Sequence, residues 1–245
     1  MKDRIAFFNW DGMGIGAIWQ NISWLYSQEK ENMQFDFYLD DFNTKKFLMI
    51  IDNLSKPKYR IKINHKEVIH KNSKFNGSKN WREACDDQYK ILLDKGYEEH
   101  QIQRLPSNLH HRYWPIKYDI VQKDYVCLYH RHILDIDKLV DPVFDEPRLF
   151  NQKQLLQIED LLHRNNIPYE ILGLPNDFSD DCKLVSECKY VIGREGGWTH
   201  VSHSARKKYM AIIKKPNFVF KFAHKCYEEL EQERTIKELE EWMHH

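Results

Sequence analysis

The chain has few of the features that mark secreted, membrane-bound or strongly charged proteins. Its 245 residues carry a formal net charge of +0, so no overall electrostatic attraction draws it to nucleic acid or to a membrane. Its apolar runs stay well below the roughly 18 residues that a membrane span needs. The five cysteines are odd in number and lack CxxC spacing, so we expect reduced thiols and neither a disulfide framework nor a zinc site.

Targeting and repeat signals are also missing. Met1 and the charged residues Lys2 to Arg4 lead straight into a short apolar segment, so we expect no signal peptide and a cytoplasmic location. The chain has no short-period repeat. A length of 245 residues fits one large domain or two of roughly 120 residues each. We expect two domains, residues 1–119 and residues 120–245.

What the chain does contain is an alternation of apolar runs and amphipathic segments. We expect strands at residues 4–9, 35–39, 59–63, 125–129, 169–172, 190–192 and 209–213. We expect helices at residues 17–28, 81–95, 152–165 and 180–188, and further helices from 214 to 243. This alternation predicts an α/β fold with parallel sheets, which bind ligands beyond the carboxyl ends of their strands.

The segment from Tyr190 to Ala205 is the most informative part of the chain. A buried strand ends in Gly193-Arg194-Glu195-Gly196-Gly197, and a helix then opens with Trp198, Thr199 and His200. The free N–H groups and the positive end of a helix dipole at such a turn attract anions. Glycines also let a ligand approach the backbone closely. The alternative is a tight strand-to-helix turn without a ligand.

Two further polar segments follow expected strands. Asp11, at the start of a turn that contains Gly12, Gly14 and Gly16, is a candidate base; alternatively, it bonds its own backbone in the turn. The glycines lack GxGxxG spacing, although Asp40 and Asp41 after the second strand keep dinucleotide binding open. His130-Arg131-His132 presents a cation, Arg131. Two histidines two residues apart, without a third ligand nearby, are weak support for a metal.

Residues Val191 to Ala205 resemble the nucleotide-sugar signature of GT-B-type glycosyltransferases, especially the ADP-heptose transferase-like group. In that group a strand ends in an acidic residue and glycine, and the next helix opens with a histidine and small residues. The run Asp11 to Gly16 resembles the group's glycine-rich loop on the acceptor side, although Asp11 precedes the glycines here. The resemblance implies two small Rossmann-like domains that face a cleft.

The resemblance also implies a reaction and a set of roles. A sugar would pass from a nucleotide-sugar donor to an acceptor hydroxyl, with inversion and without a metal or cofactor. Asp11 would be the base, while Glu195 would bind sugar or ribose hydroxyls because an acid repels a diphosphate. The donor diphosphate would be held by Arg131, Arg194, Gly196, Gly197, Thr199 and His200. His200 could instead be a core histidine, and Glu195 a capping acid.

Other functions stay open at this point. A nucleotide-sugar epimerase or hydrolase on the same fold would carry the same glycines and acid. A binding module could keep the nucleotide pocket without catalysis. The segment that begins at Lys56 and ends at Arg82 has nine basic residues against Glu67, which would suit a polyanionic acceptor such as DNA, RNA or an anionic glycan. A solvated edge strand and loop is the alternative.

Overall fold

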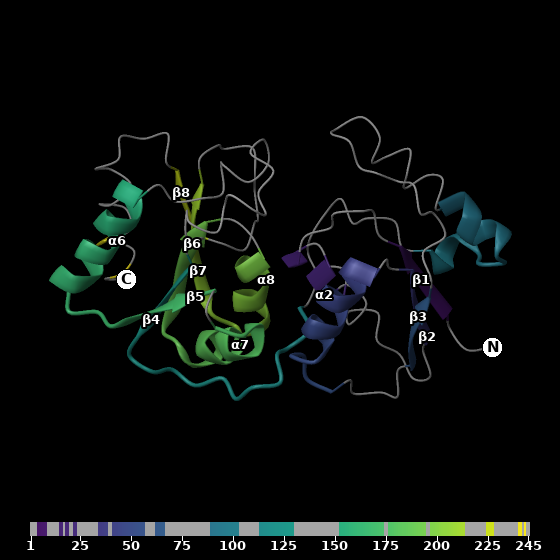
Figure 1. Ribbon diagram of the computed structural model, residues 1–245, viewed down its shortest axis with the longest axis horizontal. Helices are drawn as coiled ribbons and strands as arrows, with labels where there is room; N and C mark the ends of the chain where they lie inside the picture. Colours follow the sequence, from purple (N-terminus) through teal and green to yellow (C-terminus); the bar gives the residue numbers. More distant parts are fainter. Residues whose placement is uncertain are drawn as a thin grey trace. The chain divides into compact units, whose positions relative to one another are not determined.

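The structure is a computed structural model in which the chain divides into two compact units, Met1–Trp114 and Pro115–His245 (Figure 1). It is an α/β protein whose strands pair in parallel in each unit. The structure describes residues 4–8, 15–16, 18–19, 22–23, 34–38, 41–56, 62–66, 89–102, 113–129, 152–173, 176–194, 197–213, 224–227, 240–241 and 243.

The first unit contains a parallel sheet with the strand order β1-β2-β3. Its strands are β1 (Arg4–Phe8), β2 (Gln34–Tyr38) and β3 (Lys62–Lys66). The first two confirm the expected strands, and β3 overlaps the third and continues to Lys66. The structure adds helix α2 (Asp41–Ile51), which the sequence analysis missed, and the short 3-10 helix η1 (Glu99–Gln101).

Both faces of β2 are buried, as its position between two strands and between helices requires. Phe35 and Phe37 face one side, where the Phe37 ring packs on Phe47 of α2 with ring centroids 4.3 Å apart. Tyr38 faces the other side and packs with residues from 89–102, including Leu92. Residues 89–94 are helical. Figure 1 shows α2 and the segment 89–102 on opposite sides of the sheet.

The second face of β2 carries a buried polar network. The fully buried carboxylate of Asp36 accepts hydrogen bonds from the Tyr97 hydroxyl and from Nε2 of Gln34, the latter at 3.1 Å. The hydroxyls of Tyr38 and Tyr97 lie 2.9 Å apart. Burial is the main reason that the pKa of Tyr97 is raised, with its hydrogen bond to Asp36 next. Asp36 therefore joins the central strand to the segment that covers it.

The second unit contains a five-stranded parallel sheet with the order β5-β4-β6-β7-β8. Its elements are β4 (Val126–Tyr129), α6 (Gln152–Arg164), β5 (Tyr169–Leu172), α7 (Phe178–Glu187), β6 (Tyr190–Arg194), α8 (Gly197–Ser204), β7 (Lys208–Ile213) and β8 (His224–Tyr227). Each expected strand and helix from 125 to 213 is confirmed within a few residues.

Residues 224–227 correct one expectation. We expected only helices from 214 to 243, whereas His224 to Tyr227 form β8, which pairs with β7 from Met210 to Ile213. A strand at the end of a sheet is stabilised mainly by its pairing with the next strand, so its own residues carry a weak signal. The described residues near the end of the chain, 240, 241 and 243, are helical.

Helices cover both faces of the second sheet, with α6 on one face and α7 and α8 on the other (Figure 1). On the α6 face, Ile158, Leu161 and Leu162 form a core cluster with strand residues that include Val126 and Ile192. The chain moves one way from β4 to β5 and the opposite way afterwards. Right-handed crossovers then place the helices on opposite faces, as observed.

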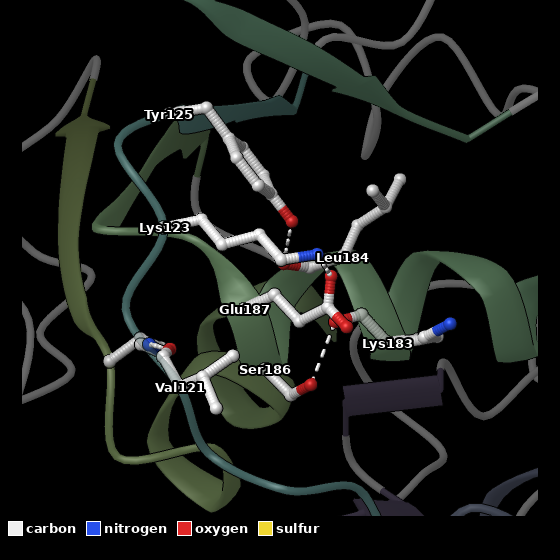
Figure 2. A network of polar contacts seen from close by, with 8 residues as sticks. Val121, Lys123, Tyr125, Lys183, Leu184, Ser186 and Glu187 are labelled. Atoms are coloured by element: carbon white, nitrogen blue, oxygen red, sulfur yellow. Dashed lines mark hydrogen bonds and ion pairs between the residues drawn. The ribbon is translucent and has the colours of Figure 1, made fainter.

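The segment before β4 is hydrogen-bonded to the C-terminal end of α7, as Figure 2 shows. The N–H groups of Val121 and Lys123 donate to the carbonyl oxygens of Ser186 and Glu187 at 3.2 and 2.7 Å. The Lys123 ammonium also pairs with the Glu187 carboxylate, and the Tyr125 hydroxyl donates to an α7 carbonyl at 2.9 Å. Residues 121–125 are therefore held to the second unit, although residues 121–124 are exposed.

Trp114 is correspondingly fixed to the first unit. Its side chain is 2% exposed, and its Nε1 donates to the carbonyl oxygen of Ser55 at 2.8 Å. Its backbone N–H donates to Oγ of Ser23 at 3.4 Å. Residues 115–120 connect these two anchors. Among the described residues, no helix has the length and apolarity to cross a bilayer.

Candidate functional site

The strand order of the second sheet reverses between β4 and β6. From β4 the chain goes first to β5 on one side and then to β6 on the other. Parallel sheets bind ligands beyond the carboxyl ends of their strands at such a reversal. At this edge Tyr129, the last residue of β4, pairs with Gly193 of β6. Two of the polar segments that the sequence singled out, 130–132 and 195–200, follow directly after these strands in the sequence.

The turn between β6 and α8 is shorter than we expected. We expected the strand to end at Ile192 and Gly193 to belong to the turn, but β6 continues to Arg194 and pairs with β7 as far as Ile212. Gly193 therefore serves the packing of the sheet. A Cβ atom there would lie 2.9 Å from Cβ of Tyr129 and 3.1 Å from its carbonyl oxygen. Only residues 195 and 196 separate the strand from α8.

Helix α8 begins at Gly197 and places its N-terminus at the strand reversal. The N–H groups of a first turn have no partner within the helix, and the helix dipole is positive there. The candidate residues Thr199 and His200 lie in this turn and are 0% and 2% exposed. Further along, the Ser202 hydroxyl donates to the carbonyl oxygen of Trp198 at 2.8 Å. This end of α8 can therefore offer backbone donors to an anion.

His200 is a neutral imidazole near pH 7. Burial, together with the nearby His203, lowers its pKa to about 3. Burial also lowers the pKa of His203. A neutral imidazole has one donor nitrogen and one acceptor nitrogen. His200 can therefore contribute a hydrogen bond to a ligand, whereas positive charge has to come from arginine or lysine.

Three aromatic side chains from different elements meet beside the first turn of α8. The ring centroids of Tyr129 and Trp198 lie 5.9 Å apart, and those of Trp198 and Phe178 lie 5.4 Å apart. The rings come from the end of β4, the start of α8 and the start of α7. We predicted no role for Tyr129 or Phe178 from the sequence. The signal available in the sequence was their position: Tyr129 is the last residue of an expected strand, and Phe178 lies just before an expected helix.

The turn between β5 and α7 is organised by a buried carboxylate, which the sequence analysis also missed. Asp181 is 1% exposed, and its two oxygens accept from the Gly173 N–H at 2.7 Å and from Nδ2 of Asn176 at 2.9 Å. Gly173 has φ +108°, a conformation that favours glycine. Burial raises the pKa of Asp181, and its two hydrogen bonds oppose that effect.

The predicted site residues fall into three groups. Gly197, Thr199 and His200 lie together in the first turn of α8, and Arg194 ends β6 with its side chain outside the described part. Gly16 is helical together with Ile15, so the helix begins before Ala17, where we expected it; Gly16 was wrongly assigned to the turn. Outside the described residues lie Asp11, Gly12, Gly14, Arg131, Glu195, Gly196 and most of the basic segment.

Within the described part of the chain, no group of three or more His, Cys, Asp or Glu side chains is placed to hold a metal ion. Cys127, Cys182 and Cys188 are buried free thiols there. Acidic residues begin α7: Asp177 is its N-cap, and Asp180 and Asp181 lie on its first turn.

Comparison with solved structures places the fold among glycosyltransferases. No protein-family model and no curated protein matches the chain. The Escherichia coli heptosyltransferase WaaC with ADP matches with a TM-score of 0.56 and 12% identity, over 98% of this chain and 98% of that chain. The overall fold of the chain is therefore similar to that of this glycosyltransferase.

A second similar protein is TibC from enterotoxigenic E. coli H10407, an iron-containing dodecameric glycosyltransferase. Two of its structures match with TM-scores of 0.53 and 0.55, each at 13% identity and over 92% of this chain. The second is a complex with ADP-D-beta-D-heptose. The present chain spans 62% of the length of TibC in the first structure.

Proposed function

We propose that the chain is a glycosyltransferase that moves a sugar from a nucleotide-sugar donor to an acceptor hydroxyl. It would use two Rossmann-like domains of the GT-B type. The observation that carries the proposal is the position of α8: its N-terminus, Gly197, follows β6 after two residues, at the reversal of strand order. The similarity to WaaC with ADP and to TibC with an ADP-sugar supports this choice of ligand.

The leaving diphosphate sets the first chemical requirement, the stabilisation of negative charge. Backbone N–H groups of Gly196, Gly197 and Thr199 would bind phosphate oxygens at the positive end of α8. Arg131 and Arg194 would supply the cations, since guanidinium groups bind phosphates in a bidentate manner. His200, neutral because of its burial, would donate a hydrogen bond. In this proposal these groups stabilise the charge of the leaving diphosphate without a metal.

The sugar and the acceptor set the second requirement. Glu195 would bind hydroxyl groups of the donor sugar or ribose, because a carboxylate beside the diphosphate would be repelled. Asp11 would remove the proton from the acceptor hydroxyl as it attacks the anomeric carbon, in an inverting displacement. Gly12, Gly14 and Gly16 would lie on the acceptor side. The acceptor is a glycan in this proposal, or a modified base of a nucleic acid if the basic segment from Lys56 to Arg82 binds a polyanion.

A thermal-shift panel with ADP, UDP, GDP and CDP tests donor binding. A nucleotide present at about 100 times its dissociation constant stabilises a protein by roughly 2.7 kcal/mol. We expect one nucleotide to do so, and we expect His200→Gln to remove most of that shift. His163→Gln, at an exposed position of α6, is the matched control. No stabilisation of the wild-type chain by any of the four would contradict the proposal.

Turnover assays then separate the classes of enzyme. We expect a nucleotide-sugar to be consumed only with an acceptor present, and Asp11→Asn to stop transfer while it leaves nucleotide binding intact. Consumption without an acceptor would instead indicate a hydrolase or an epimerase. Binding without turnover across a panel of glycan and nucleic-acid acceptors would indicate a binding module. A steep loss of acceptor binding with added salt would identify a polyanionic acceptor.

A further inference from the structure

We propose that Asp181 is a positioning residue for the donor site: it fixes the turn after β5, and through that turn it holds Phe178 against Trp198 at the start of α8. This inference deepens the proposed function and rests on it. Asp181 would not touch the donor. Its role would be transmitted through one backbone turn and one pair of rings.

The first step is the turn itself. The Asp181 carboxylate accepts from the Gly173 N–H, just after β5, and from the side chain of Asn176. Asn176 Nδ2 also donates to the carbonyl oxygen of Ile171 at 3.1 Å, and the Asn176 N–H donates to that of Gly173 at 2.9 Å. One buried carboxylate thus ties the end of β5 to the first turn of α7. Such a group is costly to bury unless it is well hydrogen-bonded, so both oxygens constrain the turn.

The second step is the contact between helices. Phe178 is the first residue of α7, three residues before Asp181. Its ring packs on Trp198, the second residue of α8, at a centroid distance of 5.4 Å and an interplanar angle of 36°. Trp198 packs in turn on Tyr129, the last residue of β4. The ring pair therefore links the turn that Asp181 holds to the helix end proposed to bind the diphosphate.

The consequence for binding follows from geometry. Backbone donors at a helix end bind an anion well only when they are held in place, within about 0.5 Å of the productive geometry. A misplacement of about 1 Å can lower the rate of an enzyme about 100-fold. Loss of the Asp181 bonds frees the Gly173 turn and with it the Phe178 ring. We therefore expect Asp181→Asn to weaken nucleotide binding roughly tenfold or more.

The test uses calorimetric titration of the whole chain with the nucleotide that stabilises the wild type, beginning with ADP, at a temperature where circular dichroism shows each variant folded. Asp180→Asn is the matched control, because Asp180 is an exposed neighbour on the same turn of α7. We expect the control to bind as wild type does. In Asp181→Asn one of the two acceptor oxygens becomes an NH2 group, which opposes either the Asn176 amide or the Gly173 N–H, so one of the two hydrogen bonds is lost.

A reversed pair separates positioning from simple loss of stability. Asp181→Asn combined with Asn176→Asp exchanges donor and acceptor between the two side chains and restores their bond. We expect a partial recovery of affinity, because the Ile171 carbonyl still loses its donor. A double variant that binds no better than Asp181→Asn alone would overturn the hydrogen-bond route. If Asp181→Asn does not fold, Phe178→Leu tests the ring contact with the carboxylate in place, and wild-type affinity there would overturn the inference.

Failure of the inference and failure of the proposed function give different results. If the wild-type chain binds none of ADP, UDP, GDP and CDP, the proposed function fails and the inference fails with it. If the wild type binds one of them and Asp181→Asn binds it equally well, the inference alone is wrong. Loss of affinity in Asp181→Asn, with wild-type affinity in Asp180→Asn and recovery in the reversed pair, supports both.

Discussion

A Cβ atom on Gly193 would lie 2.7 Å from the hydroxyl oxygen of Tyr209, a distance that real Cβ atoms essentially never show. Gly193 is on β6, and Tyr209 is on the adjacent strand β7. The glycine thus leaves space for the Tyr209 hydroxyl against the sheet, near the carboxyl ends of the strands, where the candidate site lies. The requirement comes from packing between strands, since no positive φ is found at Gly193.

The first prediction concerns this contact. Gly193→Ala should destabilise the chain by about 1–3 kcal/mol, the usual cost of overpacking. The loss, measured as the shift in the urea midpoint, should be smaller in a Tyr209→Phe background, because that change removes the nearest clashing atom. It should not vanish, since Cβ of Tyr129 remains 2.9 Å away. An equal loss in both backgrounds would show that the Tyr209 hydroxyl plays no part.

The second prediction concerns acid stability and His200. Burial holds the pKa of His200 at about 3, below the ordinary 6.5 of an unfolded chain. Between these values the unfolded chain binds more protons, so the free energy of unfolding falls as the pH falls from about 6.5 toward 3. His200→Gln should make this decline shallower, as urea titrations at several pH values would show. His203 contributes with the same sign, so part of the decline should persist.

His163→Gln, which removes an exposed histidine, is the matched control for this pH series. The comparison uses slopes against pH, so a constant loss of stability in either variant does not affect it. An identical slope in wild type and His200→Gln would show that His200 is protonated as readily in the folded chain as in the unfolded one.

The third prediction concerns the segment before β4. The amides of Val121 and Lys123 donate to carbonyls at the end of α7, whereas the structure gives the amides of Gln122 and Asp124, in the same described stretch, no backbone acceptor. Hydrogen exchange resolved by residue should therefore alternate, slow at 121 and 123 and fast at 122 and 124. Uniformly fast exchange across these four amides would mean that the segment is not fastened to α7 in solution.

The fourth prediction concerns three buried thiols of the second unit. Cys127, Cys182 and Cys188 are each 0% exposed, and burial raises the pKa of Cys182. The interaction between the Cys127 and Cys188 thiols raises the pKa of Cys127 and lowers that of Cys188, and the Cys188 thiol donates to the carbonyl oxygen of Val185 at 3.3 Å. Iodoacetamide should leave all three unmodified in the folded chain, because it needs an accessible thiolate. Peptide mapping in urea should then show all three modified, and labelling of Cys188 before unfolding would contradict its burial.

The local pattern predicted most of the second unit. The strand at Tyr169 to Leu172 and the helix from Gln152 were placed within one residue, because apolar spacing and end signals agree there. The strand β8 and helix α2 escaped prediction. The first depends on pairing with β7 at a sheet edge, and the second carries apolar residues on a face that becomes evident only against Phe37 of β2.

The candidate site divides in the same way. A short strand, a glycine-rich turn and a helix opening with Trp198, Thr199 and His200 are local features, so the sequence alone was enough to predict an anion-binding turn and its place in the chain. Only the tertiary structure shows that this turn stands at the reversal of strand order, that burial keeps His200 neutral, and that the Phe178 ring packs on Trp198 beside it. Strand order, burial and ring contacts depend on residues far apart in the chain, and the local spacing of residues does not determine which of them meet.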